Sequence, residues 1–134
     1  MKIPRAIVDE MIAHAKAEAP NECCGIVAGA DGNVLKLYRT TNAEASPVKY
    51  TIASKDLYRV YREVEDKGWE IIAFYHSHTF SEAYPSPTDV RLATWPESSY
   101  IIVSLQHPER PVARSFKIQD GHIIEETLEV EHTA

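Results

Sequence analysis

The sequence has few cysteines, no long apolar segment and no apolar leader. Only two cysteines occur among its 134 residues, Cys23 and Cys24, and neighbouring residues in a trans peptide rarely reach disulfide geometry. We therefore expect free thiols in a reducing compartment. No apolar run approaches the roughly 20 residues that span a bilayer, and Asp9 and Glu10 interrupt the apolar pattern that a signal peptide would need. These absences favour a cytoplasmic location.

Positive charge is also scarce. The chain has 14 Lys and Arg against 20 Asp and Glu, giving a formal net charge of -6, and it contains no run of basic residues. Nucleic acid and anionic membranes are therefore not expected as partners, because both would be repelled over most of the surface. Composition is otherwise typical of a globular protein, with 44% hydrophobic and 25% charged residues. This length fits one domain, so we predict a single domain over residues 1–134.

Apolar periodicity and capping residues indicate helices. In the first, apolar residues recur at intervals of three and four, which is typical of an amphipathic helix. The predicted helices run from Pro4 to Pro20, from an N-cap at Ser54 to Gly68, and from near Pro87 to before Pro96.

Short apolar runs between these helices indicate strands. The predicted strands cover residues 23–28, 34–38, 48–52, 70–75, 100–105, 113–118 and 123–130, with a polar loop at residues 76–85. The order of the elements predicts an α/β domain, in which a mixed β-sheet is flanked by about three helices.

Two histidines follow the buried strand predicted at residues 70–75. His76 and His78 are two residues apart, so in extended backbone both imidazoles point the same way and can face one metal ion. The ends of central strands are also where α/β sheets place their sites. A catalytic zinc takes three protein ligands and leaves a position open, and Asp89, on the first turn of the next helix, can supply the third.

Each of these residues has an ordinary structural interpretation as well. A lone His-x-His is weak evidence, because several unrelated metal folds use it. Ser86 and Asp89 fit a helix capping box, in which Asp89 also favours the helix dipole. Glu22, near the start of a strand, would by itself be read as a solvated acid. The capping and ligand interpretations of Asp89 are compatible.

The combined spacing resembles the motif of the JAMM (MPN-plus) metallopeptidases: Glu22, a long gap, His76-Ser77-His78, seven residues, Ser86, two residues and Asp89. The resemblance covers nearly the whole chain and is closest to the small bacterial Mec-type enzymes. The segments that carry it are Glu22-Cys23-Cys24-Gly25, Thr41-Asn42-Ala43-Glu44, Tyr75 to Thr79 and Glu82-Ala83-Tyr84-Pro85-Ser86. Cys23 is a local difference, since relatives often have another residue there.

This resemblance implies a JAMM/MPN-type domain with a layered architecture similar to that of cytidine deaminases, and one catalytic Zn²⁺. It implies that His76, His78 and Asp89 are the zinc ligands, that Glu22 is the general base, and that Ser86 supports the transition state. Mec-type relatives hydrolyse the amide bond after the C-terminal Gly-Gly of a ubiquitin-like sulfur-carrier protein and release cysteine during cysteine biosynthesis. A carrier of this kind is therefore the expected partner, and a homodimer is left open.

Three alternative functions make different demands on these residues. A JAMM isopeptidase or deubiquitinase-like enzyme acting on another ubiquitin-like conjugate would use the same site. A non-catalytic MPN-type scaffold is disfavoured by the intact residue set. A zinc deaminase is excluded, because the sequence lacks its His-x-Glu and later Cys-x-x-Cys.

The remaining histidines and the cysteines receive no chemical role. Solvated surface positions are expected for four histidines: His14, His107, His122 and His132. Cys23 and Cys24 are expected to be small buried hydrophobes that neither bind metal nor act as nucleophiles.

Overall fold

The computed structural model describes residues 1–132. In chain order its elements are β1 (Lys2–Pro4), α1 (Arg5–Glu18), β2 (Cys24–Ala30), β3 (Asn33–Thr40), α2 (Ser54–Asp66), β4 (Glu70–His78), α3 (Pro87–Leu92), β5 (Ser99–Ser104), β6 (Val112–Gln119), β7 (His122–Glu126) and β8 (Glu129–Glu131). The last two residues of the predicted domain, Thr133 and Ala134, lie outside the described residues.

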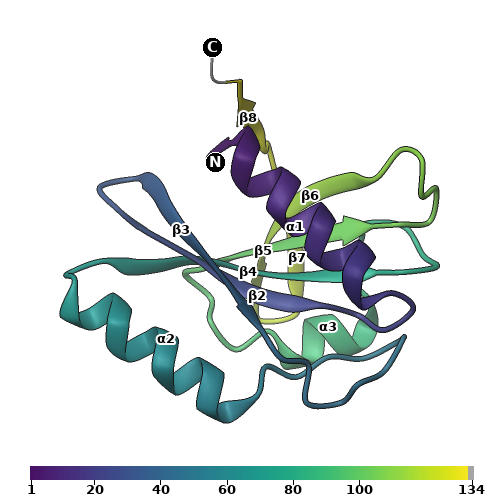
Figure 1. Cartoon of the computed structure of the whole chain (residues 1–134), viewed down its shortest axis with the longest axis horizontal. Coiled ribbons are helices and arrows are strands. Elements are labelled where there is room, and N and C mark those ends of the chain that lie inside the picture. Colours follow the sequence, from purple (N-terminus) through teal and green to yellow (C-terminus); the bar gives the residue numbers. More distant parts are fainter. Residues whose placement is uncertain (133–134) are drawn as a thin grey trace.

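Six strands form one mixed sheet in the order β3-β2-β4-β5-β6-β7 (Figure 1). Strand β4 lies inside the sheet, antiparallel to β2 and parallel to β5. β2 and β5 are buried along almost their whole length, as their apolar runs predict for strands covered on both faces. Strands β1 and β8 pair in parallel as a separate two-stranded sheet. The predicted mixed sheet is therefore confirmed.

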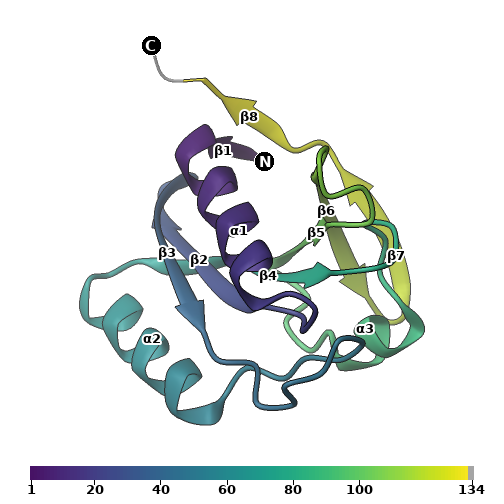
Figure 2. The same cartoon turned by 45° about the vertical axis from the view of Figure 1, so that its right-hand side comes forward.

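Helices cover both faces of this sheet (Figure 2). On one face, Val8 and Met11 of α1 belong to a buried cluster with Tyr75 of β4. On the other face, Val60 of α2 belongs to a second cluster with Phe74, and Val90 of α3 packs against it. The α1–sheet–α2/α3 layering agrees with the predicted α/β architecture and its three helices within residues 1–132.

The predicted strand at residues 48–52 is wrong. Residues 41–53 form a loop, in which only Asn42 and Ile52 make an isolated bridge. The side chain of Asn42 accepts hydrogen bonds from the amides of Glu44 and Thr51, so it takes the place of a strand partner. Val48 is 75% exposed, so the apolar pattern there does not mark a buried face.

The predicted loop at residues 76–85 begins too early, because β4 continues through His78. His76 pairs with Cys24 of β2 on one side and with Ile102 of β5 on the other, and His78 pairs with Ser104. The polar side chains at these positions suggested a loop, but the neighbouring strands supply the backbone hydrogen bonds. The two histidines therefore lie on a strand inside the sheet.

Three smaller differences separate the predicted elements from the observed ones. The strand predicted at residues 123–130 is two strands, β7 and β8, which belong to different sheets. Strand β1 was not predicted, because three residues carry no local pattern. Ser54 is the first residue of α2 and not its N-cap, a position held by Ala53 without a side-chain hydrogen bond. Among residues 1–132, the helices are all too short or too polar to span a bilayer.

Candidate metal centre

His76 and His78 project from the end of β4 toward the same point. Because they are two residues apart on one strand, they share a face of the sheet. Both are buried, with 2% and 4% of their surfaces exposed. Their Nε2 atoms lie 3.2 Å apart, so both rings converge as the sequence predicts.

Asp89 reaches the same point from the first turn of α3. Ser86 and Asp89 form the predicted capping box: the Ser86 hydroxyl accepts from the Asp89 amide at 3.1 Å, and the Ser86 amide donates to Asp89 Oδ2 at 2.9 Å. The same Oδ2 lies 3.1 Å from Nε2 of His76 and 3.0 Å from Nε2 of His78. The cap therefore aims the carboxylate at the histidines, and the two interpretations of Asp89 coexist.

The chemistry of these atoms fits a cation. Nδ1 of His78 donates to the Glu82 carbonyl at 2.8 Å, because a carbonyl can only accept. In neutral His78 the Nε2 atom is then an acceptor, and it faces the acceptor Oδ2 of Asp89. Two acceptors in contact repel each other unless a proton or a metal ion lies between them. The potential ligand atoms of His76, His78 and Asp89 all lie within 4.8 Å of one another, a compact group that could hold a metal ion.

The charges within this group are strongly coupled. Burial would raise the pKa of Asp89, but the contacts with His76 and His78, whose imidazoles carry positive charge when protonated, hold this pKa well below its usual range. Burial lowers the pKa of His76, an effect that Asp89 only partly opposes. Burial lowers the pKa of His78, but the contacts with Asp89 and the Glu82 carbonyl raise it by more, so this pKa lies above its usual value. Asp89 is therefore ionised near neutral pH.

Glu22 is buried before the start of β2 and is not the solvated acid of the local interpretation. It is 4% exposed, and its Oε1 has no hydrogen-bond partner within residues 1–132. Burial raises its pKa to about 7, with the charge of His78 opposing this rise and that of Asp89 adding to it. A carboxyl group that interacts with the charges of His78 and Asp89 and titrates near neutral pH is suited to act as a general base.

Comparisons with known proteins identify the family. The domain family described as "Prokaryotic homologs of the JAB domain" matches residues 4–119. This chain belongs to that family. The match confirms the predicted JAMM/MPN-plus membership.

Two curated relatives of this JAB-family chain carry enzyme names. The CysO-cysteine peptidase of Mycobacterium tuberculosis is 43% identical over 126 residues, which cover 92% of this chain and 86% of the relative. The desampylase of Haloferax volcanii is 33% identical over 103 residues, 72% of this chain and 74% of the relative. The chain is therefore a JAMM-type hydrolase, as predicted.

A solved structure agrees with the fold of this JAB-family chain. The solution structure of a protein from Desulfitobacterium hafniense matches with a TM-score of 0.88 and 33% identity, covering 99% of this chain and 94% of that one.

Two side-chain contacts in this JAB-family chain differ from the sequence predictions or were not predicted. His14 was expected at the surface, but it is 4% exposed and its Nδ1 lies 2.8 Å from the Tyr75 hydroxyl. Its position beside Met11 and Ala15 on the apolar stripe of α1 was the available signal. Tyr50, in the loop of residues 41–53, stacks on His76 with ring centroids 4.3 Å apart. No local pattern indicates that contact. His107, His122 and His132 are exposed, as predicted.

The two cysteines are buried and free, as predicted. Burial raises the pKa of Cys23 to about 12 and that of Cys24 to about 11. Both thiols therefore stay protonated near neutral pH and are poor nucleophiles and metal ligands.

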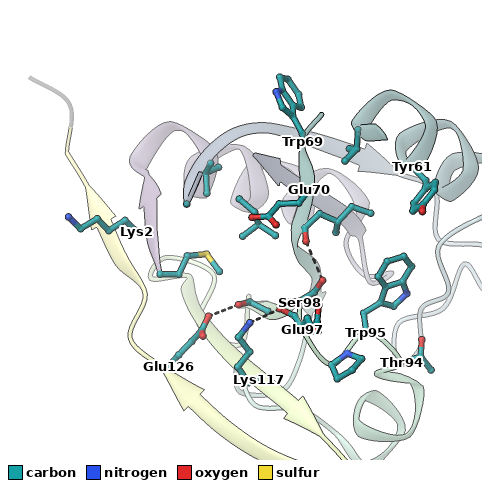
Figure 3. A pocket seen from close by; sticks show the side chains of 18 of the residues that line it. Lys2, Tyr61, Trp69, Glu70, Thr94, Trp95, Glu97, Ser98, Lys117 and Glu126 are labelled. Carbon is teal, nitrogen blue, oxygen red and sulfur yellow. Dashed lines mark hydrogen bonds between the residues drawn. The ribbon is translucent and has the colours of Figure 1, made fainter. Parts of the chain in front are cut away.

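The JAB-family chain also has a cavity of about 710 Å³ away from this site (Figure 3). It lies at the opposite end of β4, beside Glu70, and Trp69, Trp95, Lys117 and Glu126 contribute to its walls. Two of its charged groups are engaged by hydrogen bonds: Glu126 accepts from Ser99 and Ser115, and Lys117 donates to a backbone carbonyl. None of the metal-binding candidates lines it.

Proposed function

We propose that this chain is a zinc-dependent peptidase that hydrolyses the amide bond after the C-terminal Gly-Gly of a ubiquitin-like sulfur-carrier protein and releases cysteine. The observation that carries the proposal is the convergence of His76, His78 and Asp89 at the end of β4, with the buried carboxyl of Glu22 close enough for the charges of His78 and Asp89 to shift its pKa. The 43% identity to the CysO-cysteine peptidase supports this substrate class.

His76, His78 and Asp89 are the proposed ligands of a single Zn²⁺, through two imidazole nitrogens and one carboxylate oxygen. Three protein ligands of this type leave a position open, as catalytic zinc requires. When bound, the ion supplies Lewis acidity, which polarises the scissile carbonyl and makes water acidic enough to ionise near neutral pH. The Glu82 carbonyl fixes the tautomer of His78, and the capping box fixes Asp89.

Glu22 is the proposed general base and general acid. Its carboxylate takes a proton from the attacking water and returns it to the leaving amine, which for this substrate is the nitrogen of cysteine. Burial favours the exchange, because it brings the pKa of Glu22 to about 7.

Ser86 is the proposed donor to the developing oxyanion. Its oxygen accepts from the Asp89 amide, which leaves its own hydroxyl proton free to donate. The loss of one such donor costs about 3 kcal/mol in the barrier.

The substrate is tested with two purified adducts of the same carrier. One is a ubiquitin-like sulfur-carrier protein with cysteine linked by an amide to its C-terminal Gly-Gly, and the other is the same carrier joined through its Gly-Gly to a lysine side chain. We expect zinc-loaded protein to release cysteine from the first adduct, detected by mass spectrometry as the loss of one cysteine residue. Intact cysteine adduct after long incubation would refute the proposed substrate.

An isopeptidase is the second candidate, favoured by the 33% identity to the desampylase. In the same experiment it would cleave the lysine adduct faster than the cysteine adduct. A chain that binds no zinc and cleaves neither adduct would instead be a scaffold of the same fold.

We also propose that residues 1–134 form one domain that acts in the cytoplasm. Both buried clusters draw on β2, β4 and β5 of the same sheet, which couples the two faces. The buried free thiols suit a reducing compartment. The single-domain proposal is tested by unfolding. We expect one cooperative transition with the same midpoint by circular dichroism and by tryptophan fluorescence.

A further inference from the structure

The peptide group between Glu22 and Cys23 is held from two sides by side chains. Its carbonyl oxygen, on Glu22, accepts from Nδ2 of Asn42 at 3.0 Å. Its amide, on Cys23, donates to Oγ of Ser77 at 2.8 Å. The two side chains belong to different segments, since Asn42 opens the loop of residues 41–53 and Ser77 lies on β4. Together they fix the orientation of one rigid peptide plane.

The hydrogen bond from the Cys23 amide to the Ser77 hydroxyl replaces part of the sheet ladder. The amide of Ser77 donates to the Cys23 carbonyl at 3.1 Å, but the Cys23 amide binds the Ser77 hydroxyl. The last residue pair between β2 and β4 is Cys24 with His76. The serine hydroxyl thus holds the chain at the point where it leaves the sheet toward Glu22. Ser77 is fully buried, so water does not compete for this bond.

Asn42 ties the neighbouring loop to the same point. Its Nδ2 also donates to the Lys49 carbonyl, and its Oδ1 accepts from two loop amides. The amide of Glu22 itself donates to the Ser46 carbonyl of this loop at 2.9 Å. The backbone on both sides of Glu22 is therefore held by hydrogen bonds, while Oε1 of its carboxyl group has no hydrogen-bond partner among residues 1–132.

We infer that Asn42 and Ser77 are positioning residues, which orient Glu22 toward His76 and His78 by clamping the Glu22–Cys23 peptide group. With no hydrogen bond at Oε1, that carboxylate oxygen depends for its direction on the backbone that carries it. Ser77 lies between the two histidines on β4, so the clamp holds the base and both imidazoles in one unit. The inference rests on the proposed function and adds residues that touch neither substrate nor metal.

Three variants and one control test the clamp. S77A removes the hydroxyl that holds the Cys23 amide, and S77T keeps it. N42D keeps the oxygen that accepts from Glu44 and Thr51 but removes the donor to Glu22. S115A is the matched control, because Ser115 is equally buried and its hydroxyl binds Glu126, away from Glu22.

Each variant is assayed as zinc-loaded protein with the cysteine adduct of the carrier protein, at the plateau of its own pH–rate profile. We expect S77A and N42D to lower kcat on the order of 10- to 100-fold, because small misplacements of a reacting group cost this much. KM and zinc content should stay at wild-type values, S77T should restore most of kcat, and S115A should leave it unchanged. The S77A/N42D double variant should lose less than the product of the single effects, since both hold one peptide plane.

Hydrogen exchange reports the clamp without using activity. We expect the Cys23 amide of S77A to exchange on the order of tenfold faster than in wild type. Unchanged exchange would overturn the hydrogen bond itself. Faster exchange with wild-type kcat, or a kcat that falls only in proportion to zinc content, would overturn the positioning role. A wild-type chain that cleaves neither adduct would overturn the proposed function, while the exchange rate would still report the bond.

Discussion

At the scale of single residues, Glu22 is the side chain whose environment differs most from that of an ordinary glutamate. It is buried, its Oε1 has no hydrogen-bond partner in the described part of the chain, and burial raises its pKa to about 7. We predict that E22Q retains zinc but loses turnover by about 10²- to 10⁴-fold, the usual contribution of a general base. E18Q is the control, because Glu18 is a half-exposed neighbour on α1. Kinetics and zinc analysis of the purified proteins measure turnover and zinc content. An E22Q variant as active as wild type would show that Glu22 is not the base.

The raised pKa of Glu22 also predicts how stability depends on pH. A carboxyl group with a folded-state pKa of about 7 and an ordinary value of 4.5 binds its proton more tightly when folded. It therefore opposes folding increasingly as pH rises from 4.5 to 7. In zinc-free protein, E22Q should be more stable than wild type at pH about 8, by up to about 3 kcal/mol, and similar at pH about 4. Urea unfolding at both values measures this, and an equal difference at both would contradict the shift.

At the scale of elements, α3 combines a cap with a ligand, and the two roles can be separated. D89N keeps an oxygen that can accept from the Ser86 amide but removes the negative charge. We predict that D89N loses zinc and activity, and that zinc-free D89N is less stable than wild type at neutral pH, because the contacts that lower the Asp89 pKa favour its ionised form in the folded chain. S86A should destabilise zinc-free protein by about 1 kcal/mol, through loss of the N-cap, while the charge of Asp89 stays in place. Full zinc occupancy in D89N would mean that Asp89 only caps α3 and is not a zinc ligand.

The contact between β2 and β4 supplies another test. A Cβ atom at Gly25 would overlap the ring of Tyr75, which is fully buried. We predict that G25A destabilises the protein by about 3 kcal/mol, because the close-packed core has no room to move the ring. Thermal unfolding measures the effect. A variant of wild-type stability would mean that the ring has room to move.

The elements also show where sequence reasoning reaches its limit. The helix periodicity after Pro4 and the His-x-His after an apolar run are local patterns, and the structure has α1 and the convergent histidines where they indicate. Strands β1 and β8 pair only with each other, and their first pair, Lys2 with Glu129, joins residues that are 127 positions apart in the sequence. The stacking of Tyr50 on His76 and the clamp by Asn42 and Ser77 likewise depend on tertiary contacts, which no local pattern encodes.

At the scale of the whole molecule, the candidate site joins segments that are remote in sequence. Glu22 precedes β2, the histidines end β4, and Asp89 begins α3. Because such a site forms only in the folded chain, metal binding should stabilise folding. We predict that zinc at about 100 times its Kd stabilises wild type by about 2.7 kcal/mol and leaves the H76A/H78A variant unchanged. Equal stabilisation of both proteins would place the bound zinc elsewhere.

The location of zinc in an active crystal tests the central claim most directly. Anomalous diffraction at the zinc edge, from crystals of protein shown to release cysteine from the carrier adduct, locates the ion. We predict one peak per chain, about 2.0 to 2.2 Å from Nε2 of His76, Nε2 of His78 and an Oδ atom of Asp89. An active protein with no zinc at this position would contradict the account.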